Sequence, residues 1–259
     1  MIYAGAGLAL LWLLYWIFRG IELKREDRFE LFKDELLSNI GWCLLFFVAV
    51  PCLVYYLSYY PYGKAAGMGW PEMWVSKDYA KLVLDNQSYM FNYHSDIVAE
   101  HPYASRWYQW IFDIRPILYY LEYFNDGTKS AFGAFLNPIV CWTGLIAMLL
   151  CVPLTVMNRS GRALFILVGY LAQLVPWMFV SRLTFAYHYF PCLIFLVLAI
   201  ALVLDAVWDS GRKAAKPIVY SFTGVCVGLF AAFYPVLTGV RASQQYTDIF
   251  LQWFESWPF

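Results

Sequence analysis

Residues 137–156 read NPIVCWTGLIAMLLCVPLTV, and this stretch decides the class of fold. It forms most of an apolar run, 134–157, that contains no charged residue. A helix needs about 20 such residues to cross the ~30 Å hydrocarbon layer of a bilayer. Asn137 followed by Pro138 is typical of a helix start, because asparagine caps the first N–H groups and proline fits the first helical position. The stretch therefore predicts a membrane-spanning helix.

Five further apolar runs lie on either side of it, at 1–18, 40–60, 163–181, 187–206 and 217–239. The composition agrees, with 62% hydrophobic and 14% charged residues, whereas a soluble domain has about 45–50% apolar and about 25% charged residues. The first run lacks a basic start and a cleavage signal and is followed directly by Arg19, which favours a span over a signal peptide. These runs predict an all-α integral membrane protein with about six transmembrane helices and one long extracytoplasmic loop.

The basic residues of the short links predict the orientation of these spans. If the six runs alternate across the bilayer, three basic links fall on one side: 19–39, the link after the third run and the link after the fifth. That side is expected to be cytoplasmic, because positively charged loops are retained inside. The N-terminus, the long interval 61–133 and the end of the chain are then extracytoplasmic. Arg182 is the one basic residue in the remaining short link.

The chain is accordingly expected to contain four parts. Residues 1–60 hold two transmembrane helices with a cytoplasmic amphipathic link, and 61–133 form an extracytoplasmic juxtamembrane loop. Residues 134–240 form a four-transmembrane-helix domain, and 241–259 form an extracytoplasmic tail.

Two amphipathic helices are predicted outside the spans. Apolar residues at helical spacing among charges predict a helix over 22–37, which lies on the inner membrane surface or binds a partner. In the loop, a stripe with the period of an α-helix predicts a helix over 72–92 along the outer surface, begun by Pro71. The first pattern consists of Phe29, Phe32 and Leu36, and the second of Val75, Tyr79, Leu82, Asn86 and Met90.

Charge and cysteine usage exclude some partners. The formal net charge is zero and no Lys/Arg-rich block recurs, so no nucleic-acid partner is expected. The six cysteines all lie in apolar runs without CxxC spacing, which predicts small buried side chains rather than disulfides or metal ligands. The sequence predicts no metal site and no cofactor.

The loop 61–133 carries the first group of candidate site residues. His94 and His101 lie close to Asp96 and Glu100, a cluster that fits a general base, a metal site, substrate contact or structural hydrogen bonding. The spacing is not a recognised metal motif. Both histidines are candidates for contact with the substrate.

The same loop carries aromatic and charged candidates directly after His101. Trp107 and Trp110 are candidates for stacking on a sugar or for anchoring at the membrane interface. Arg115 is a further substrate-loop candidate, although it is also expected to pair with Asp113 and to orient the loop.

Arg182 and His188 are the candidates for binding a phosphate. Arg182 lies where the fourth span emerges, and a cation at that depth costs free energy unless it reaches the interface or has a partner. A lipid phosphate fits, because guanidinium presents two parallel donors to it. His188 is either a second donor to the same phosphate or a satisfied core histidine.

An ordered set of short motifs resembles the C-terminal half of the protein O-mannosyltransferase family, with bacterial members the most similar. The similarity runs from about residue 86 to about residue 240, and each motif alone is short. The motifs are Asn92-Tyr-His94, His101-Pro-Tyr-Ala-Ser105, Trp107-Tyr-x-Trp110, Arg115-Pro-Ile-x-Tyr-Tyr120, Asn137-Pro138, Gly169-Tyr-Leu-Ala-Gln173, Pro176-Trp177 and Ser181-Arg-x-Thr-Phe-x-Tyr-His-Tyr-Phe-Pro191.

The resemblance implies a multispan glycosyltransferase of the type C fold. Such enzymes move a sugar, usually mannose, from a polyprenyl or dolichyl phosphate to Ser or Thr hydroxyls of an acceptor protein, with inversion at the sugar. The implied location is the bacterial plasma membrane with the active face extracytoplasmic. The implied partners are the polyprenyl-phosphate-linked sugar, the acceptor protein and the lipid bilayer.

The sequence departs from the family pattern in one respect. The family's catalytic acidic pair lies in the loop after its first span, and no residue here, Asp96 and Glu100 included, matches that pair by context. The chain is therefore expected to be a C-terminal module that is incomplete without that N-terminal loop: a truncated product, a fragment or a separately encoded half. A separate N-terminal half is then a candidate partner. The alternative is a non-catalytic membrane scaffold, or a subunit that binds the donor lipid or a partner.

Overall fold

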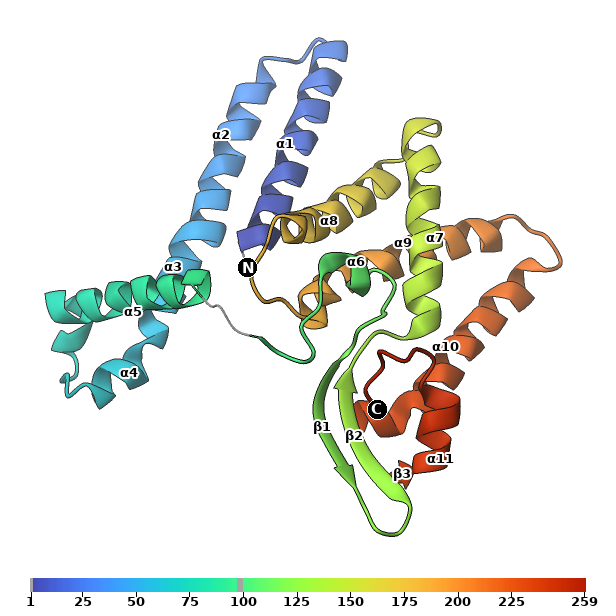
Figure 1. Ribbon diagram of the computed structural model, residues 1–259. Helices are drawn as coiled ribbons and strands as arrows, with labels where there is room; N and C mark the ends of the chain where they lie inside the picture. Colours follow the sequence, from blue (N-terminus) through green and yellow to red (C-terminus); the bar gives the residue numbers. More distant parts are fainter. Residues whose placement is uncertain (1, 97–99) are drawn as a thin grey trace. The chain divides into compact units, whose positions relative to one another are not determined.

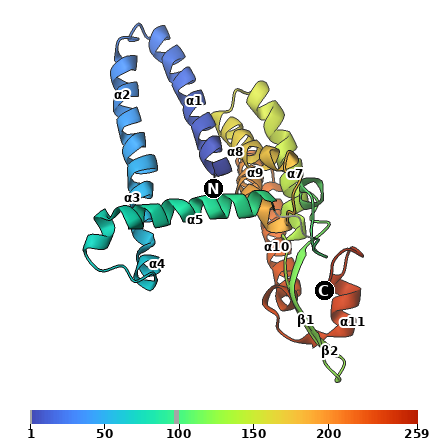
Figure 2. The ribbon, with the colours of Figure 1, turned by 60° about the vertical axis from the view of Figure 1, so that its left-hand side comes forward.

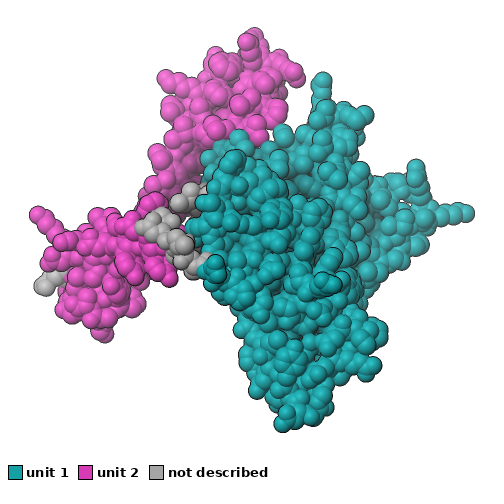
Figure 3. Space-filling view, in the orientation of Figure 1, with its two compact units in different colours: residues 1–11, 99–259 teal, residues 12–98 magenta. Residues whose placement is uncertain are grey.

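The computed structural model describes residues 2–96 and 100–259, which pack as two compact units. One unit consists of residues 12–98 and the other of residues 1–11 with 99–259 (Figure 3). Over the described residues, six helices are long and apolar enough to cross a membrane, as the sequence predicted. They are Gly5–Arg25, Leu31–Ala65, Pro138–Val156, Gly161–Met178, Ala186–Asp209 and Ala215–Thr238.

The unit 12–98 begins with residues 12–25 of α1 (Ile2–Arg25), which form a helical hairpin with α2 (Leu31–Leu44) (Figures 1 and 2). The prediction of one amphipathic helix over 22–37 was wrong, because the chain reverses between these two helices. Asp27 adopts a left-handed conformation there, with φ of 56°, which ends the helix. The apolar and charged residues that predicted one helix thus lie at the end of α1, in the turn, and at the start of α2.

Charged and polar side chains join the two helices of this hairpin. The guanidinium of Arg19 donates from Nε to Glu35 Oε2 and from Nη2 to Glu35 Oε1, both at 2.9 Å. Its Nη1 donates to Glu22 at 2.7 Å. Trp12 Nε1 donates to Asn39 Oδ1 at 2.6 Å. These bonds satisfy polar groups that would otherwise be costly in a span.

The remainder of this unit is also helical. The chain passes through a π-helical turn, Leu45–Ala49, into α3 (Val50–Ser58) and α4 (Tyr60–Ala65). A 3₁₀ turn, Glu72–Val75, then precedes α5, Lys77–Asp96.

The helix predicted over 72–92 exists but begins later, at Lys77. Ser76 is extended, with ψ of 138°, and its Oγ accepts from the backbone N–H groups of Asp78 and Tyr79 at 3.1 and 3.3 Å. It therefore caps α5. Val75 lies outside the helix and is 88% exposed, whereas Tyr79 is fully buried. The predicted stripe is correct from Tyr79 to Asn86, but Met90 is exposed.

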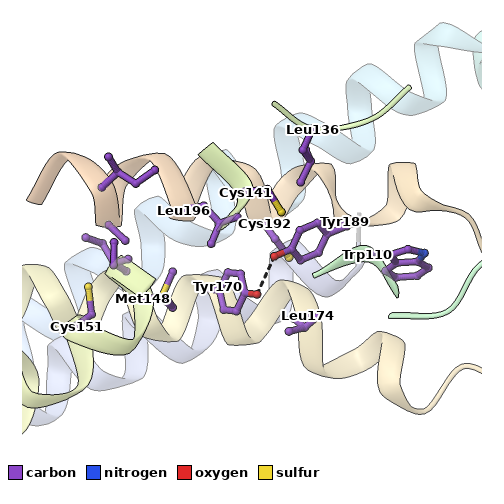
Figure 4. Packing of buried hydrophobic residues seen from close by; sticks show 14 of the residues in the cluster. Trp110, Leu136, Cys141, Met148, Cys151, Tyr170, Leu174, Tyr189, Cys192 and Leu196 are labelled. Atoms are coloured by element: carbon purple, nitrogen blue, oxygen red, sulfur yellow. Dashed lines mark hydrogen bonds between the residues drawn. The ribbon is translucent and has the colours of Figure 1, made fainter. Parts of the chain in front are cut away.

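The other unit is built on α7 (Pro138–Val156), α8 (Gly161–Met178) and α9 (Phe190–Asp209), with α10 (Ala215–Thr238) beside α9. Small residues allow the helices to approach closely, since a Cβ on Gly169 would lie 2.0 Å from Phe195. In the core between these helices Tyr170 and Tyr189 share a hydrogen bond of 2.8 Å between their hydroxyls (Figure 4).

The cysteines are all free, and three of them follow the sequence prediction closely. Cys141, Cys151 and Cys192 are fully buried in the core of α7, α8 and α9. Cys43 and Cys226 are partly buried, and Cys52 is exposed.

The structure contains a small antiparallel sheet that the sequence did not predict, with two of its strands in the long loop. Strands β1 (Ile117–Tyr123) and β2 (Thr128–Ala134) form a hairpin, and β3 (Ala242–Ser243) pairs with β2. Gly127 adopts φ of 77° in the turn, and Asp126 accepts from the Thr128 N–H at 3.0 Å. The fold is thus mostly helical with one added hairpin.

The end of the chain packs onto this hairpin rather than extending away from it. Trp257 and Phe259 are almost fully buried against Phe135 and Phe233. Lys129, itself 3% exposed, donates to Asp248 at 2.6 Å. Hydrophobic burial and this ion pair hold the tail against the sheet.

Candidate functional site

Two loops that are distant in sequence meet in the unit formed by residues 1–11 and 99–259, and they carry most of the predicted site residues. They are residues 101–116 and 180–190, called here the paired loops. The backbone N–H of Ser105 donates to the Thr184 carbonyl at 2.9 Å, and Thr184 Oγ1 donates back to the Ser105 carbonyl at 2.6 Å. Both residues are buried, so this reciprocal pair fixes one loop against the other.

Arg106 adds a second connection between the paired loops. Its Nη1 donates to the carbonyls of Val180 and Ser181 at 3.3 and 2.9 Å. These carbonyls follow the end of α8, where backbone acceptors have no helical partner. The Arg106 backbone N–H donates to Gln109 at 2.8 Å, which begins the short helix α6, Trp107–Trp110.

The short helix α6 places its two tryptophans differently. Trp110 is buried, and its Nε1 donates to Ser105 Oγ at 2.8 Å. Trp107 is partly buried against the core of α7, α8 and α9 and contacts Tyr108 edge to face, while Tyr108 is 53% exposed. Trp110 is therefore a packing residue, and the more exposed aromatic surface lies at Trp107 and Tyr108.

His188 lies in a cage of aromatic rings at the start of α9. Its ring centroid is 4.2 Å from that of Trp177, 4.4 Å from that of Tyr187 and 5.9 Å from that of Trp110. Its Nδ1 lies 3.1 Å from the backbone N and 2.9 Å from the backbone O of Phe185. Within the part of the chain that the structure describes, no hydrogen bond forms at Nε2. One ring nitrogen thus orients the ring and the other stays available.

Arg182 differs from Arg106 in having no partner. It is half-buried, and its guanidinium forms no hydrogen bond or ion pair with residues 2–96 or 100–259. It lies close enough to Tyr187 and His188 to act on both electrostatically. An unpaired cation beside an available imidazole nitrogen can bind an anion.

His101 and Arg115 lie on the same paired loops with more local roles. His101 is exposed, its Nδ1 accepts from the Tyr103 N–H at 3.2 Å, and its ring contacts Phe185 edge to face at 5.0 Å. Arg115 Nη2 donates to the Pro102 carbonyl at 2.5 Å, and its Nε is buried without a partner. The side chains of both residues therefore stabilise the turn that begins the loop.

The predicted ion pair between Asp113 and Arg115 was wrong. Asp113 turns inward instead, with only 3% of its surface exposed and a left-handed φ of 54°. Its Oδ2 accepts from the Leu136 N–H at 3.0 Å, and its carbonyl accepts from Trp257 Nε1 at 2.8 Å. Burial raises the pKa of this carboxyl to about 8, opposed by the Leu136 hydrogen bond.

The remaining loop candidates are not brought to the paired loops. His94 is exposed near the end of α5 in the unit 12–98 and contacts Tyr93. The side chain of Asp96 and the whole of residues 97–99 lie outside the described residues, and Glu100 is exposed. In the described part of the chain no three His, Cys, Asp or Glu side chains gather as metal ligands would.

The paired loops therefore combine one unpaired cation, an available imidazole nitrogen and exposed aromatic surface. They contain one acidic residue, Asp113, and its carboxyl is buried and bonded to the backbone. The arrangement suits binding of an anion next to an apolar or sugar-bearing group. It does not present a carboxylate to a substrate.

Comparison with known proteins identifies the family of this sequence. A sequence model described as the C-terminal four TMM region of protein-O-mannosyltransferase matches residues 79–257. A polyprenol-phosphate-mannose–protein mannosyltransferase of Mycolicibacterium smegmatis is 25% identical over 270 residues, covering 93% of this chain and 52% of the relative. A protein of the same description from Mycobacterium tuberculosis is 27% identical over 184 residues, covering 64% of this chain and 35% of the relative.

A solved structure is similar in fold. It is the Saccharomyces cerevisiae protein O-mannosyltransferase Pmt1–Pmt2 complex bound to the sugar donor, with a TM-score of 0.57 and 21% identity. The similarity covers 71% of this chain and 27% of the yeast chain. The chain spans about half the length of the mycolicibacterial relative that it matches.

Proposed function

Because the chain belongs to the protein O-mannosyltransferase family, we propose that it is a module for transfer of mannose from a polyprenyl-phosphate donor to Ser or Thr hydroxyls of acceptor proteins. Membership confirms the resemblance noted in the sequence motifs, and with the six apolar helices it makes the chain an integral membrane protein. The relatives named above are described as using polyprenol-phosphate mannose and a protein.

The observation that carries the proposal is the unpaired guanidinium of Arg182, in the loop 180–190 beside Tyr187 and His188. It follows α8 and precedes the turn that holds His188, so it lies at the end of one span and the start of the next. The phosphate of a polyprenyl-linked sugar lies at such a depth, with its hydrocarbon tail in the bilayer. Guanidinium offers phosphate two parallel donors, and positive charge stabilises phosphate as a leaving group. His188 Nε2 is a second candidate donor.

The exposed aromatic surface at Trp107 and Tyr108 is proposed to face the sugar. Aromatic rings provide a flat apolar surface with a polar edge, which suits an amphipathic ligand at the interface. His101, exposed at the start of the same loop, is a candidate contact for the sugar or the acceptor.

Activation of the acceptor hydroxyl requires a base, and the paired loops present no carboxylate for this role. The Asp113 carboxyl is buried and accepts a hydrogen bond from the Leu136 N–H. We therefore assign the catalytic carboxylate to a segment other than these loops, either elsewhere in a longer polypeptide or on a separate N-terminal half. The active face is proposed to be extracytoplasmic in a bacterial plasma membrane, as the basic links predict.

Binding of a labelled polyprenyl-phosphate mannose to membranes that contain each variant tests the proposal. Arg182→Ala is expected to weaken binding by about tenfold or more, because charge-assisted hydrogen bonds contribute about 1.5–3 kcal/mol each. Arg182→Lys is expected to be intermediate, because ammonium keeps the charge and loses the planar pair of donors. Binding is normalised to the amount of inserted protein.

Arg162→Ala provides the matched control. Arg162 lies at the other end of the same helix, and its side chain is 81% exposed. The substitution Arg162→Ala is expected to leave donor binding unchanged. Equal affinity of the wild type and both Arg182 variants would remove Arg182 from the donor site and contradict the proposal.

The second candidate is a non-catalytic subunit that binds the donor lipid or a partner. The absence of a presented carboxylate in the paired loops favours it. Transfer of mannose to a Ser/Thr peptide, measured with and without a co-expressed N-terminal segment that carries an acidic pair, separates the two. Donor binding without transfer in both cases would favour the binding subunit.

A further inference from the structure

The end of α8 leaves backbone carbonyls that attract a cation. The helix ends at Met178, and the carbonyls of Val180 and Ser181 follow it without a helical partner. The C-terminal end of a helix carries partial negative charge, and side chains of Lys or Arg commonly bind carbonyls there. The cation nearest in sequence is Arg182, whose guanidinium could reach back to these acceptors.

In the structure, the cation at the end of α8 comes from another part of the chain. Arg106 Nη1 donates to both carbonyls, at 3.3 and 2.9 Å, from a separation of 74 and 75 residues. Arg182 meanwhile forms no hydrogen bond or ion pair with any described residue. The two arginines thus have different roles. Arg106 donates to the backbone carbonyls at the end of α8, and Arg182 stays unpaired.

The backbone around Arg106 is held independently of its side chain. Ser105 and Thr184 exchange hydrogen bonds of 2.9 and 2.6 Å, and the Arg106 N–H donates to Gln109 at 2.8 Å. The guanidinium is therefore carried to the end of α8 by contacts that do not involve it. Removing the side chain would uncover the two carbonyls without removing these contacts.

We propose that Arg106 is a positioning residue that occupies the carbonyls of Val180 and Ser181 and thereby keeps Arg182 available to the donor phosphate. This inference rests on the proposed function of Arg182. Without Arg106, the guanidinium of Arg182 pairs with the uncovered carbonyls, and phosphate must displace it from them. Arg106 acts on the phosphate only through Arg182.

A double-mutant cycle on donor binding tests this coupling. Arg106→Ala is expected to weaken binding of labelled polyprenyl-phosphate mannose by about tenfold, and Arg106→Lys to restore most of it, because ammonium can donate to both carbonyls. In a chain that already carries Arg182→Ala, Arg106→Ala is expected to cause no further loss.

Thr184→Val is the matched control. It removes the hydroxyl donor to the Ser105 carbonyl and loosens the same paired loops, but it leaves the Val180 and Ser181 carbonyls covered. Its binding loss is expected to be clearly smaller than that of Arg106→Ala.

Two results would overturn the inference. Additive losses in the double variant would mean that Arg106 acts independently, as a direct ligand or through general stability. A Thr184→Val loss equal to that of Arg106→Ala would mean that loosening the loops explains the effect. If Arg182→Ala alone leaves binding unchanged, the proposed role of Arg182 itself is contradicted. This result differs from the two above, which contradict only the role of Arg106.

Discussion

Asp113 shows how one buried residue joins three segments that are far apart in sequence, through its side chain and its backbone carbonyl. Its carboxyl binds the Leu136 N–H before α7, and its carbonyl binds Trp257 at the end of the chain. The buried carboxyl has its pKa raised to about 8, so the neutral form predominates near pH 7. A folded-state pKa above the ordinary value of about 3.9 makes stability depend on pH.

Stability is expected to fall as pH rises towards and through 8. The contribution of Asp113 is fully present below about pH 4, where the carboxyl is protonated in both states, and it is lost progressively up to the folded-state pKa. Asp113→Asn keeps an acceptor for the Leu136 N–H and cannot ionise, so it should flatten this dependence. Thermal unfolding in detergent micelles between pH 5 and about 9 measures it. An unchanged slope in the variant would show that another group titrates.

At the level of helices, close packing decides how α8 and α9 fit together. Gly169 occurs in the interior of α8, where glycine costs about 1 kcal/mol relative to alanine. The cost has a structural reason, because a Cβ there would lie 2.0 Å from the ring of Phe195. Small residues let membrane helices approach closely, and such contacts replace the hydrophobic effect as a driving force inside lipid.

Gly169→Ala should destabilise the protein by about 1–3 kcal/mol despite its better helix propensity, because the added methyl group overpacks the α8–α9 contact. Gly228→Ala in α10 is the matched control, since a Cβ there meets no atom within 4 Å. It should be neutral or slightly stabilising. Unfolding midpoints in detergent compare the two variants, and equal midpoints would show that Phe195 yields without cost.

For the whole molecule, the orientation in the bilayer remains the broadest prediction from sequence. The links 157–160 and 210–214 are short, and the basic residues around them favour the cytoplasmic side. The hairpin of β1 and β2 is then extracytoplasmic, together with the paired loops and the proposed donor site.

Labelling with a membrane-impermeant maleimide tests this orientation. Asn158→Cys and Ala214→Cys should react only after cells are permeabilised, whereas Asn125→Cys at the hairpin tip should react in intact cells. All three positions are exposed, and labelling of the parent chain gives the baseline for its six cysteines. Reaction of Asn158→Cys in intact cells would reverse the topology and with it the proposed active face.

The sequence by itself determined where the spans lie, because a bilayer selects long apolar runs whatever their neighbours are. The run 134–157 became Pro138–Val156, and 217–239 became Ala215–Thr238. The motifs also contained the residues that the paired loops bring together. The hairpin had a local signal, since Asn125-Asp126-Gly127 separates two segments rich in aromatic and small residues.

Only the tertiary structure decided which partners each of these residues binds. Arg106 and Arg182 are alike in sequence, yet one binds backbone carbonyls and the other stays unpaired. The Asp113 carboxyl points inward to the Leu136 N–H, 23 residues away, and the Asp113 backbone carbonyl accepts from Trp257, 144 residues away. Transfer into lipid is a property of each segment, so a local pattern encodes it. A hydrogen bond between distant segments depends on where the whole chain places both partners, and no local pattern encodes that.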